Sequence, residues 1–536
     1  MTLTAKQRNI IMSSKFENAL KNTLNDVCAC TENGACGFKT AGNPLLDINF
    51  AVSSLRSKSN TEVEKMFSDA FYFNPLLATK WLFMLRDVRF GLGERRSFRI
   101  CFKWLANTRP EIVKKLIPLV AEYGRFDDII YSGLEGELWD NVVDIVVNQL
   151  EQDVKNMEAG KPVSLMAKWL PSCNTSSRST VAIARKLIAS LGMSEKQYRK
   201  TLSKLRAYLK VIEVKMSAKQ WSEIDYEAVP SKANCKYNSA FLRNDETRRR
   251  AFLSALEKGE AKINSSANFP CDIVHAYTKN GHVSWYRSRI ESEDAALEAM
   301  WKALPEVKIN GNLICCCDGS GSMTVQVDPH SKMTALDVCN ALGIYCSEHL
   351  TGPFKNKYIT FSDHPQYVDF TNAKSLAEKL NIAYEHDECA STNIEAVMDL
   401  MLETSIRNHL KQEDIPDLCI ISDMEFNAAI NFGGGYSYWN RSSDYSASKN
   451  ALFERIRQKW EAAGYKLPRI IFWNVNSRTG TIPLQQNENG IVLCSGFSQT
   501  QFKMLMSNKT DPYEVLVEAL NVERYQPVED AVKTVL

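Results

Sequence analysis

The pattern of apolar residues changes near residue 300, and this change constrains the fold of the 536-residue chain more than any other feature. Before it, apolar residues recur at spacings of three and four, the period of a helix that buries one face. After it, short apolar runs alternate with helical stretches, which is typical of a sheet built from strand–helix units. The sequence therefore predicts an all-α part followed by an α/β part.

The helical part is expected over residues 45–300, after a turn-rich lead-in segment at residues 1–44. Its helices are predicted at Val63–Phe71, Leu76–Phe90, Ser97–Ala106, Glu111–Tyr123 and Leu138–Met157. Consecutive helices joined by short turns favour antiparallel pairs, as in a HEAT-like solenoid or ring. The sequence has no fixed repeat period, so this prediction depends on the order of elements alone.

The α/β part is expected over residues 305–510, with C-terminal docking helices at residues 511–536. Strands are predicted at Val307–Cys317, Lys357–Phe361, Gln366–Phe370, Leu418–Asp423, Arg469–Val475 and Ile491–Cys494. Helices are predicted at Ala335–Leu350, Ile394–Leu410, Ser446–Ala463, Thr500–Ser507 and Pro512–Leu520. This order predicts a doubly wound, Rossmann-like sheet.

A loop rich in Gly and Ser follows the first predicted strand, in the segment CCCDGSGSM at residues 315–323. Asp318, Ser320 and Ser322 stand at alternate positions, which places one carboxylate and two hydroxyls around one point. These are hard oxygen ligands that suit Mg²⁺, with Mn²⁺ or Ca²⁺ as alternatives. An ion with so few protein ligands keeps open positions for water or for a partner's carboxylate. For Asp318 alone, a capping role in a turn is the alternative.

This arrangement resembles the metal-ion-dependent adhesion site of von Willebrand factor A (vWA) domains, which binds ligands and does not usually transform them. The resemblance implies a Thr and a second Asp from later loops, and Thr392 and Asp423 stand in those places. All three loops follow the carboxyl ends of predicted strands or precede a helix at that edge, where open α/β sheets bind ligands. Ser391 and Met424 depart from the pattern, because vWA domains often have Gly there.

Composition and charge limit the class of protein. Hydrophobic content of 44% with 24% charged residues predicts a globular protein, and no apolar run approaches the roughly 20 residues that span a bilayer. Fifteen cysteines, three of them consecutive in a strand, predict reduced thiols and hence a cytoplasmic location. We also expect a monomer without membrane contact. Residues 1–300 carry 44 Lys and Arg against 34 Asp and Glu, whereas residues 301–536 carry 21 against 29. The basic N-terminal part favours a polyanionic partner.

Basic residues are concentrated between residues 178 and 219 and recur there at helical spacing. Such a stripe can contact successive phosphates, with an affinity that falls as salt rises. The candidate RNA-binding residues are Arg178, Lys186, Lys196, Arg199, Lys200, Lys204, Arg206 and Lys210. A solvated helix face is the plain alternative.

Several stretches resemble the Ro/TROVE proteins, in which a helical domain precedes a vWA domain. AEYGRFDD at 121–128 and GLGERR at 91–96 resemble TROVE helix junctions. Closer matches to the vWA-bearing relatives of Ro are NPLLD at 43–47, AKWLP at 167–171, YRKTL at 198–202, WSEIDY at 221–226 and VPSKA at 229–233. The resemblance implies a ring of helices closed by the vWA domain, with RNA bound to the ring. It assigns no RNA contacts to single residues.

Two segments fall outside this scheme. Cys28, Cys30 and Cys36 could begin a zinc site, although no fourth ligand is near in the sequence. Residues 431–448 are rich in Gly, Tyr, Ser and Asn, which suits partner contact, base stacking or an inert loop.

Taken together, the sequence predicts a non-enzymatic RNA-binding scaffold with a divalent-cation site. The alternative is a protein–protein adaptor whose metal site binds an acidic residue of a partner, without RNA. A hydrolase is the third reading, since two carboxylates and a metal can activate water. The sequence offers no nucleophile–base pair, P-loop or second metal cluster to support it.

Overall fold

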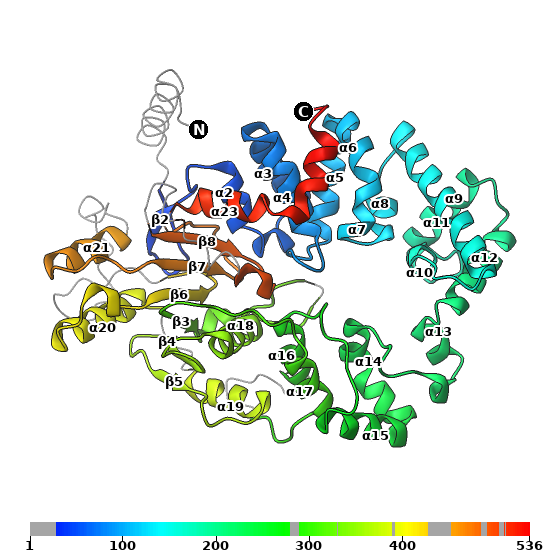
Figure 1. Ribbon diagram of the computed structural model, residues 1–536. Coiled ribbons are helices and arrows are strands. Elements are labelled where there is room, and N and C mark those ends of the chain that lie inside the picture. The colour runs from blue at the N-terminus through cyan, green and yellow to red at the C-terminus, as the bar shows by residue number, and fades with distance from the viewer. Residues whose placement is uncertain are drawn as a thin grey trace.

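The computed structural model describes residues 28–278, 289–329, 331–387, 392–426, 452–483, 490–502, 509 and 511–536. Within them, a helical N-terminal region is followed by a mixed, largely parallel sheet flanked by helices (Figure 1). The predicted class, α followed by α/β, is confirmed at this level. No helix among the described residues has the length and apolar content needed to cross a membrane.

The helical region is a series of mostly short helices. Local signals set their ends: Ser59 and Glu62 form a capping box at the start of α3, and the Asn74 side chain caps α4, which begins with a proline. The helices are α2 (Pro44–Phe50), α3 (Asn60–Phe73), α4 (Pro75–Arg86), α5 (Arg96–Thr108), α6 (Pro110–Leu116), α7 (Val120–Tyr123), α8 (Phe126–Tyr131), α9 (Gly136–Glu158), α10 (Met166–Trp169), α11 (Arg178–Ser190), α12 (Glu195–Tyr208), α13 (Ile212–Ser217), α14 (Ser231–Asn244), α15 (Glu246–Glu257), α16 (Pro270–Thr278) and α17 (Ala295–Lys302).

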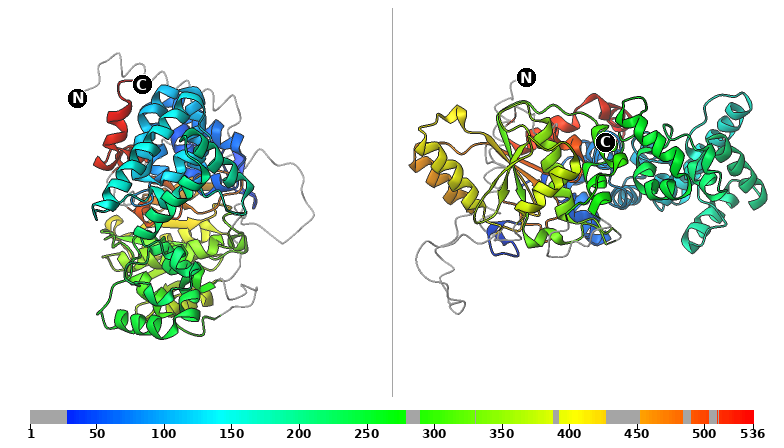
Figure 2. Two further views of the ribbon diagram at one scale, coloured as in Figure 1. Left: turned by 90° about the vertical axis from the view of Figure 1, so that its right-hand side faces the viewer. Right: turned by 90° about the horizontal axis from the view of Figure 1, so that it is seen from below.

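The series forms an arc that leaves the sheet region and returns to it (Figure 1). At its start, α2 packs against β8 (Ile491–Ser495), and at its end α16 packs against α18 (Ala335–His349). The helices α9–α12 lie at the opposite end of the molecule from α20 (Ile394–Arg407) and α21 (Leu452–Ala462), as the view from below also shows (Figure 2). Both ends of the arc are therefore attached to the sheet region.

The sheet has the strand order β5-β4-β3-β6-β7-β8. Its other strands are β3 (Leu313–Asp318), β4 (Lys357–Phe361), β5 (Tyr367–Asp369), β6 (Asp417–Ser422) and β7 (Ile470–Asn474). All neighbouring strands are parallel except β4 and β5. Every residue of β3, β7 and β8 is buried, because helices cover both faces of such a sheet.

The C-terminal helices α23 (Pro512–Leu520) and α24 (Gln526–Val532) turn back onto the helical region. The buried ammonium of Lys80 in α4 donates to Asn521 Oδ1 at 2.7 Å and to Glu529 Oε2 at 2.8 Å. Arg524 pairs with Asp87 at 2.9 Å. These charged contacts fasten the end of the chain to α4.

Some predicted boundaries are wrong, for local reasons. The helix predicted at Glu111–Tyr123 is divided by a 3₁₀ turn at Ile117–Leu119, where Pro118 has no N–H to donate. The helix predicted at Leu76–Phe90 ends at Arg86, because the Asp87 carboxylate accepts the backbone N–H groups of Arg89 and Phe90 in a turn. The strand predicted from Val307 begins only at Leu313, and α19 (Leu376–His386) was not predicted.

Candidate metal centre

The parallel pairing of β3 with β6 brings two acidic residues to the same edge of the sheet. Asp318 is the last residue of β3, and Asp423 directly follows β6. The register pairs Cys317 with Ile421, so β3 and β6 end at the same level of the sheet. Ligands bind at this carboxyl edge in open α/β sheets. We call the loops that follow β3 and β6, together with Thr392, the metal edge.

The loop after β3 wraps its own polar groups around Asp318. Asp318 Oδ1 accepts the Ser320 N–H at 2.9 Å, and its Oδ2 accepts the Ser422 hydroxyl at 2.6 Å. The hydroxyl oxygens of Ser320 and Ser322 lie 3.0 Å apart. Three of the predicted ligands, Asp318, Ser320 and Ser322, are therefore together.

Thr392 joins this edge through the loop after β6. Its hydroxyl donates to the backbone oxygen of Glu425 at 3.0 Å. Glu425 in turn donates its N–H to Asp423 Oδ1 at 3.2 Å. Asp423 is also hydrogen-bonded to the Ser322 side chain, and this bond links the two loops, so the five predicted ligands belong to one cluster. The neighbouring Ser391 lies outside the described residues.

The electrostatics of the edge favour a cation. Asp318 and Asp423 are both fully buried. Burial, helped by the charge of Asp423, raises the pKa of Asp318 to about 7. Burial also raises the pKa of Asp423, although the Arg478 guanidinium acts in the opposite direction. A nearby divalent cation would favour the ionised form of both carboxylates.

A third carboxyl group lies beside the loop. A Cβ at Gly319 would come within 2.7 Å of Asp387 Oδ1, so this close approach requires glycine. Desolvation raises the pKa of Asp387 to about 7, while the Asn340 amide, which donates to it at 3.2 Å, opposes the shift. The edge therefore concentrates more acidic groups than the sequence motif contains.

Four further residues at the edge were not predicted from the sequence. Arg478 Nη1 lies 3.2 Å from Asp423 Oδ2, and the buried carboxylate of Glu425 accepts the N–H groups of Glu32 at 2.8 Å and Arg478 at 2.9 Å. The Asn33 amide donates to Thr392 Oγ1 at 3.2 Å. These residues come from segments far apart in the chain. Only Glu425 could have been predicted from the local sequence, because it stands two positions after Asp423.

The donor set fits a hard divalent cation. It contains two carboxylates and three hydroxyls, which suit Mg²⁺ or Mn²⁺ better than a softer metal. Across the described part of the chain, no group of three or more His, Cys, Asp or Glu side chains is placed to hold a metal ion. Cys30, which belongs to the zinc alternative, is exposed, and the side chains of Cys28 and Cys36 lie outside the description.

Comparison with known proteins places the chain in a family. Residues 31–122 and 136–313 match the model described as Domain of unknown function (DUF2828). The chain belongs to the DUF2828 family. Residues 312–534 match a second model, Domain of unknown function (DUF7788). Uncharacterized protein L728 of Acanthamoeba polyphaga mimivirus is similar to this chain, with 29% identity over 539 residues that cover 93% of this chain and 88% of the relative.

The two matches divide the features described above. The DUF2828 match covers the arc apart from residues 123–135, which contain α8, and it ends at the start of β3. The DUF7788 match begins at residue 312 and contains all five candidate ligands. Glu32 and Asn33, which contact the metal edge, belong to the DUF2828 match. The contacts of Glu32 and Asn33 with the metal edge therefore join the two matched regions.

The candidate RNA-binding residues separate into two groups. Lys196, Arg199, Lys200 and Lys204 are exposed on α12, Lys210 lies just past its end, and Arg178 is exposed at the start of α11. Arg206 instead donates to the backbone oxygens of Ala167 and Leu170, both at 2.8 Å, and to Ser172 Oγ at 2.9 Å. Lys186 lies over the Trp139 ring at 3.9 Å. Arg206 and Lys186 thus make contacts within the fold, although Lys186 is also exposed, and both remain predicted RNA contacts.

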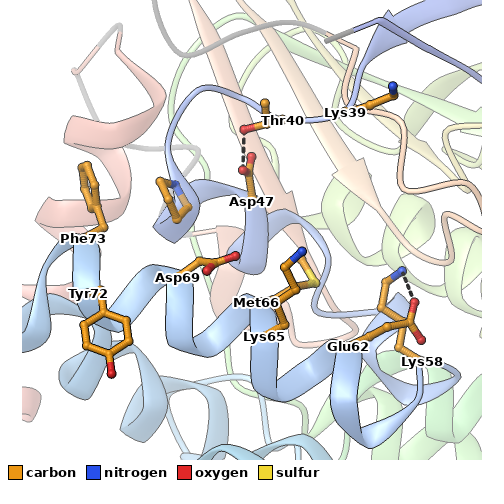
Figure 3. A pocket seen from close by; sticks show the side chains of 11 residues that line it. Lys39, Thr40, Asp47, Lys58, Glu62, Lys65, Met66, Asp69, Tyr72 and Phe73 are labelled. Carbon is orange, nitrogen blue, oxygen red and sulfur yellow. Dashed lines mark hydrogen bonds and ion pairs between the residues drawn. The ribbon is translucent and has the colours of Figure 1, made fainter. Parts of the chain in front are cut away.

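A separate cavity of about 680 Å³ lies between the loop after β2 (Cys36–Phe38) and α2 and α3 (Figure 3). Its lining mixes three lysines and three acidic residues with Tyr72 and Phe73. Asp47 points toward Thr40 in this cavity, and the Thr40 hydroxyl donates to its carboxylate at 2.5 Å. The cavity shares no residue with the metal edge.

The segment at residues 431–448 lies outside the described residues.

Proposed function

We propose that the protein is a non-enzymatic scaffold that binds a divalent cation at the metal edge and RNA phosphates on α12. In this proposal the sheet region is a vWA domain and the arc is a HEAT-like, TROVE-type domain closed by it. The single observation that carries the cation site is the placement of two buried carboxylates, Asp318 and Asp423, at neighbouring strand ends beside two serine hydroxyls.

The five ligand residues would have distinct roles. Asp318 and Asp423 would supply the negatively charged ligands of the cation. The hydroxyl oxygens of Ser320, Ser322 and Thr392 would be its uncharged ligands. The cation would supply a positive centre with open positions that a partner's carboxylate can take. The guanidinium of Arg478 already neutralises part of the charge of Asp423. The cation would therefore mainly compensate the charge of Asp318, whose pKa is raised.

A titration with Mg²⁺ or Mn²⁺ by calorimetry tests the cation site. We expect Asp423→Asn to weaken binding at least tenfold, because it removes one of two charged ligands. Asp417→Asn is the matched control, since Asp417 lies at the opposite end of the same strand, and it should bind as the parent does. If neither ion binds the parent, and chelator leaves its melting temperature unchanged, the proposed site is wrong.

RNA binding is supported by the exposed cations of α12. Phosphate contacts release counterions, so the affinity should fall steeply with salt. We expect the triple change of Arg199, Lys200 and Lys204 to Glu to weaken binding and to lower the salt slope by about 0.7–0.9 for each phosphate that is no longer neutralised. A control with exposed Lys302, Lys308 and Lys355 changed to Glu should keep the slope. Parent-like binding by the first variant would refute the RNA surface.

The adaptor function is the second candidate, because a carboxylate of this chain, that of Glu32, already lies at the metal edge. It predicts that cation binding persists while the parent protein binds no RNA near physiological salt. The two titrations therefore separate the candidates.

A further inference from the structure

The hairpin formed by β1 (Cys28–Cys30) and β2 lies against the metal edge, although about 390 residues separate them in the chain. Its turn makes three polar contacts with the loop after β6. The Thr31 hydroxyl donates to the Phe426 backbone oxygen at 2.5 Å, and the Asn33 amide donates to the Glu425 backbone oxygen at 2.6 Å. The Glu32 N–H donates to the Glu425 carboxylate at 2.8 Å. The backbone of the turn is therefore held in place.

The side chain of Glu32 reaches the metal edge through one arginine. Arg478 Nη2 donates to Glu32 Oε2 at 2.7 Å, while Nη1 of the same guanidinium lies 3.2 Å from Asp423 Oδ2. Nη1 also donates to the Ser322 backbone oxygen at 3.4 Å. One guanidinium thus joins a carboxylate of the hairpin to two of the candidate ligand residues.

The two carboxylates on Arg478 differ in their access to solvent. Asp423 is buried, whereas the Glu32 side chain is 49% exposed and that of Arg478 is 24% exposed. Glu32 therefore occupies the solvent side of the guanidinium, where an external carboxylate would arrive. Exposed ion pairs contribute little to stability, so the Glu32 carboxylate can leave while the turn stays bound through its backbone.

Building on the proposed cation site, we propose that Arg478 and the metal edge form a docking site for an acidic side chain of a partner protein, and that Glu32 occupies this site in the free protein. A partner carboxylate displaces Glu32, takes the same guanidinium donor and lies next to the open positions of the cation. The chemistry of the present occupant identifies the ligand class, a carboxylate.

Binding of fluorescein-labelled hexaglutamate to the full-length protein, followed by anisotropy with Mg²⁺ and with chelator, tests this proposal. Glu32→Gln should bind the probe about threefold to fivefold more tightly than the parent in Mg²⁺, because the weakly held competing carboxylate is gone. Glu195→Gln is the matched control, since Glu195 is also a half-exposed glutamate paired with an arginine, Arg185 at 3.2 Å. This variant should bind as the parent does.

Adding Arg478→Gln to Glu32→Gln should abolish the gain, because the docking donor is removed. Equal affinity of parent and Glu32→Gln, no binding to either, or a gain that survives loss of Arg478 would each overturn the inference. Calorimetry on the same samples separates this failure from failure of the cation site. Mg²⁺ binding without the expected probe result refutes only the docking site, whereas absence of both Mg²⁺ and Mn²⁺ binding refutes the cation site of the proposed function.

Discussion

Replacing Asp47 with asparagine should change how the stability of the helical region responds to pH. Asp47 lies in α2, where its carboxylate accepts the Thr40 hydroxyl at 2.5 Å and the Ala41 N–H at 2.6 Å (Figure 3). Desolvation outweighs these hydrogen bonds and raises the pKa of Asp47 from 3.8 to about 6. The folded protein therefore holds this proton more tightly than the unfolded chain does.

The sign and size of the effect follow from that difference. A raised pKa gives a stabilisation that is complete below pH 3.8 and is lost as the pH rises through about 6. A shift of this size corresponds to about 3 kcal/mol, of which about 2 kcal/mol falls between pH 4.5 and 7.5. Asparagine does not titrate, so Asp47→Asn should lack this loss.

Urea unfolding at pH 4.5 and at pH 7.5, monitored by amide exchange in α2 and α3, measures the effect. The free energy of unfolding of the parent, relative to that of Asp47→Asn, should fall by about 2 kcal/mol from pH 4.5 to 7.5. Asp144→Asn is the control, because Asp144 is exposed on α9 and does not line this cavity, and it should follow the parent. Parallel pH profiles for the parent and Asp47→Asn would refute the assigned desolvation.

Two further predictions concern the stability of the fold. Gly124→Ala should lower the free energy of unfolding by about 2–4 kcal/mol in a thermal melt, because its Cβ would lie 2.6 Å from the Asp128 carboxylate in a buried ion pair; an unchanged melting temperature would contradict this. Glu529→Gln should leave the buried ammonium of Lys80 without an anion and speed proteolytic removal of α24, at a cost of about 2 kcal/mol. Asp530→Asn, which alters an exposed acid on the same helix, should be cleaved at the parent's rate, and equal rates for both variants would argue against the anchoring role.

The sequence predicted the buried strands well because a parallel strand covered on both faces is a continuous apolar run. The predicted strand at Lys357–Phe361 matches β4, and β6, β7 and β8 begin and end within one residue of their predicted limits. Helix α19 was not predicted, because two of its four buried residues are alanines, which give only a weak periodic pattern of hydrophobicity.

In the candidate site, too, some residues could be predicted from the local sequence and others could not. Asp318, Ser320 and Ser322 are neighbours in the chain, so their convergence is a local property of one loop. Arg478 and Glu32 reach the edge only through tertiary contacts between segments hundreds of residues apart, which no local pattern records. Likewise, the spacing of the basic residues did not distinguish exposed Lys204 from Arg206, whose guanidinium stabilises the preceding loop.

The attachment of the arc at both ends has a consequence for cleavage of the chain. Residues around α13 and α14, among them Ile212, Tyr226 and Phe241, form a small core apart from the main one. A single cut between α12 and α13 would therefore leave two fragments, one held through α2 on β8 and the other continuous with β3 and packed through α16 on α18. The nicked protein would remain one particle, and its α12 surface would then be tethered from one side only.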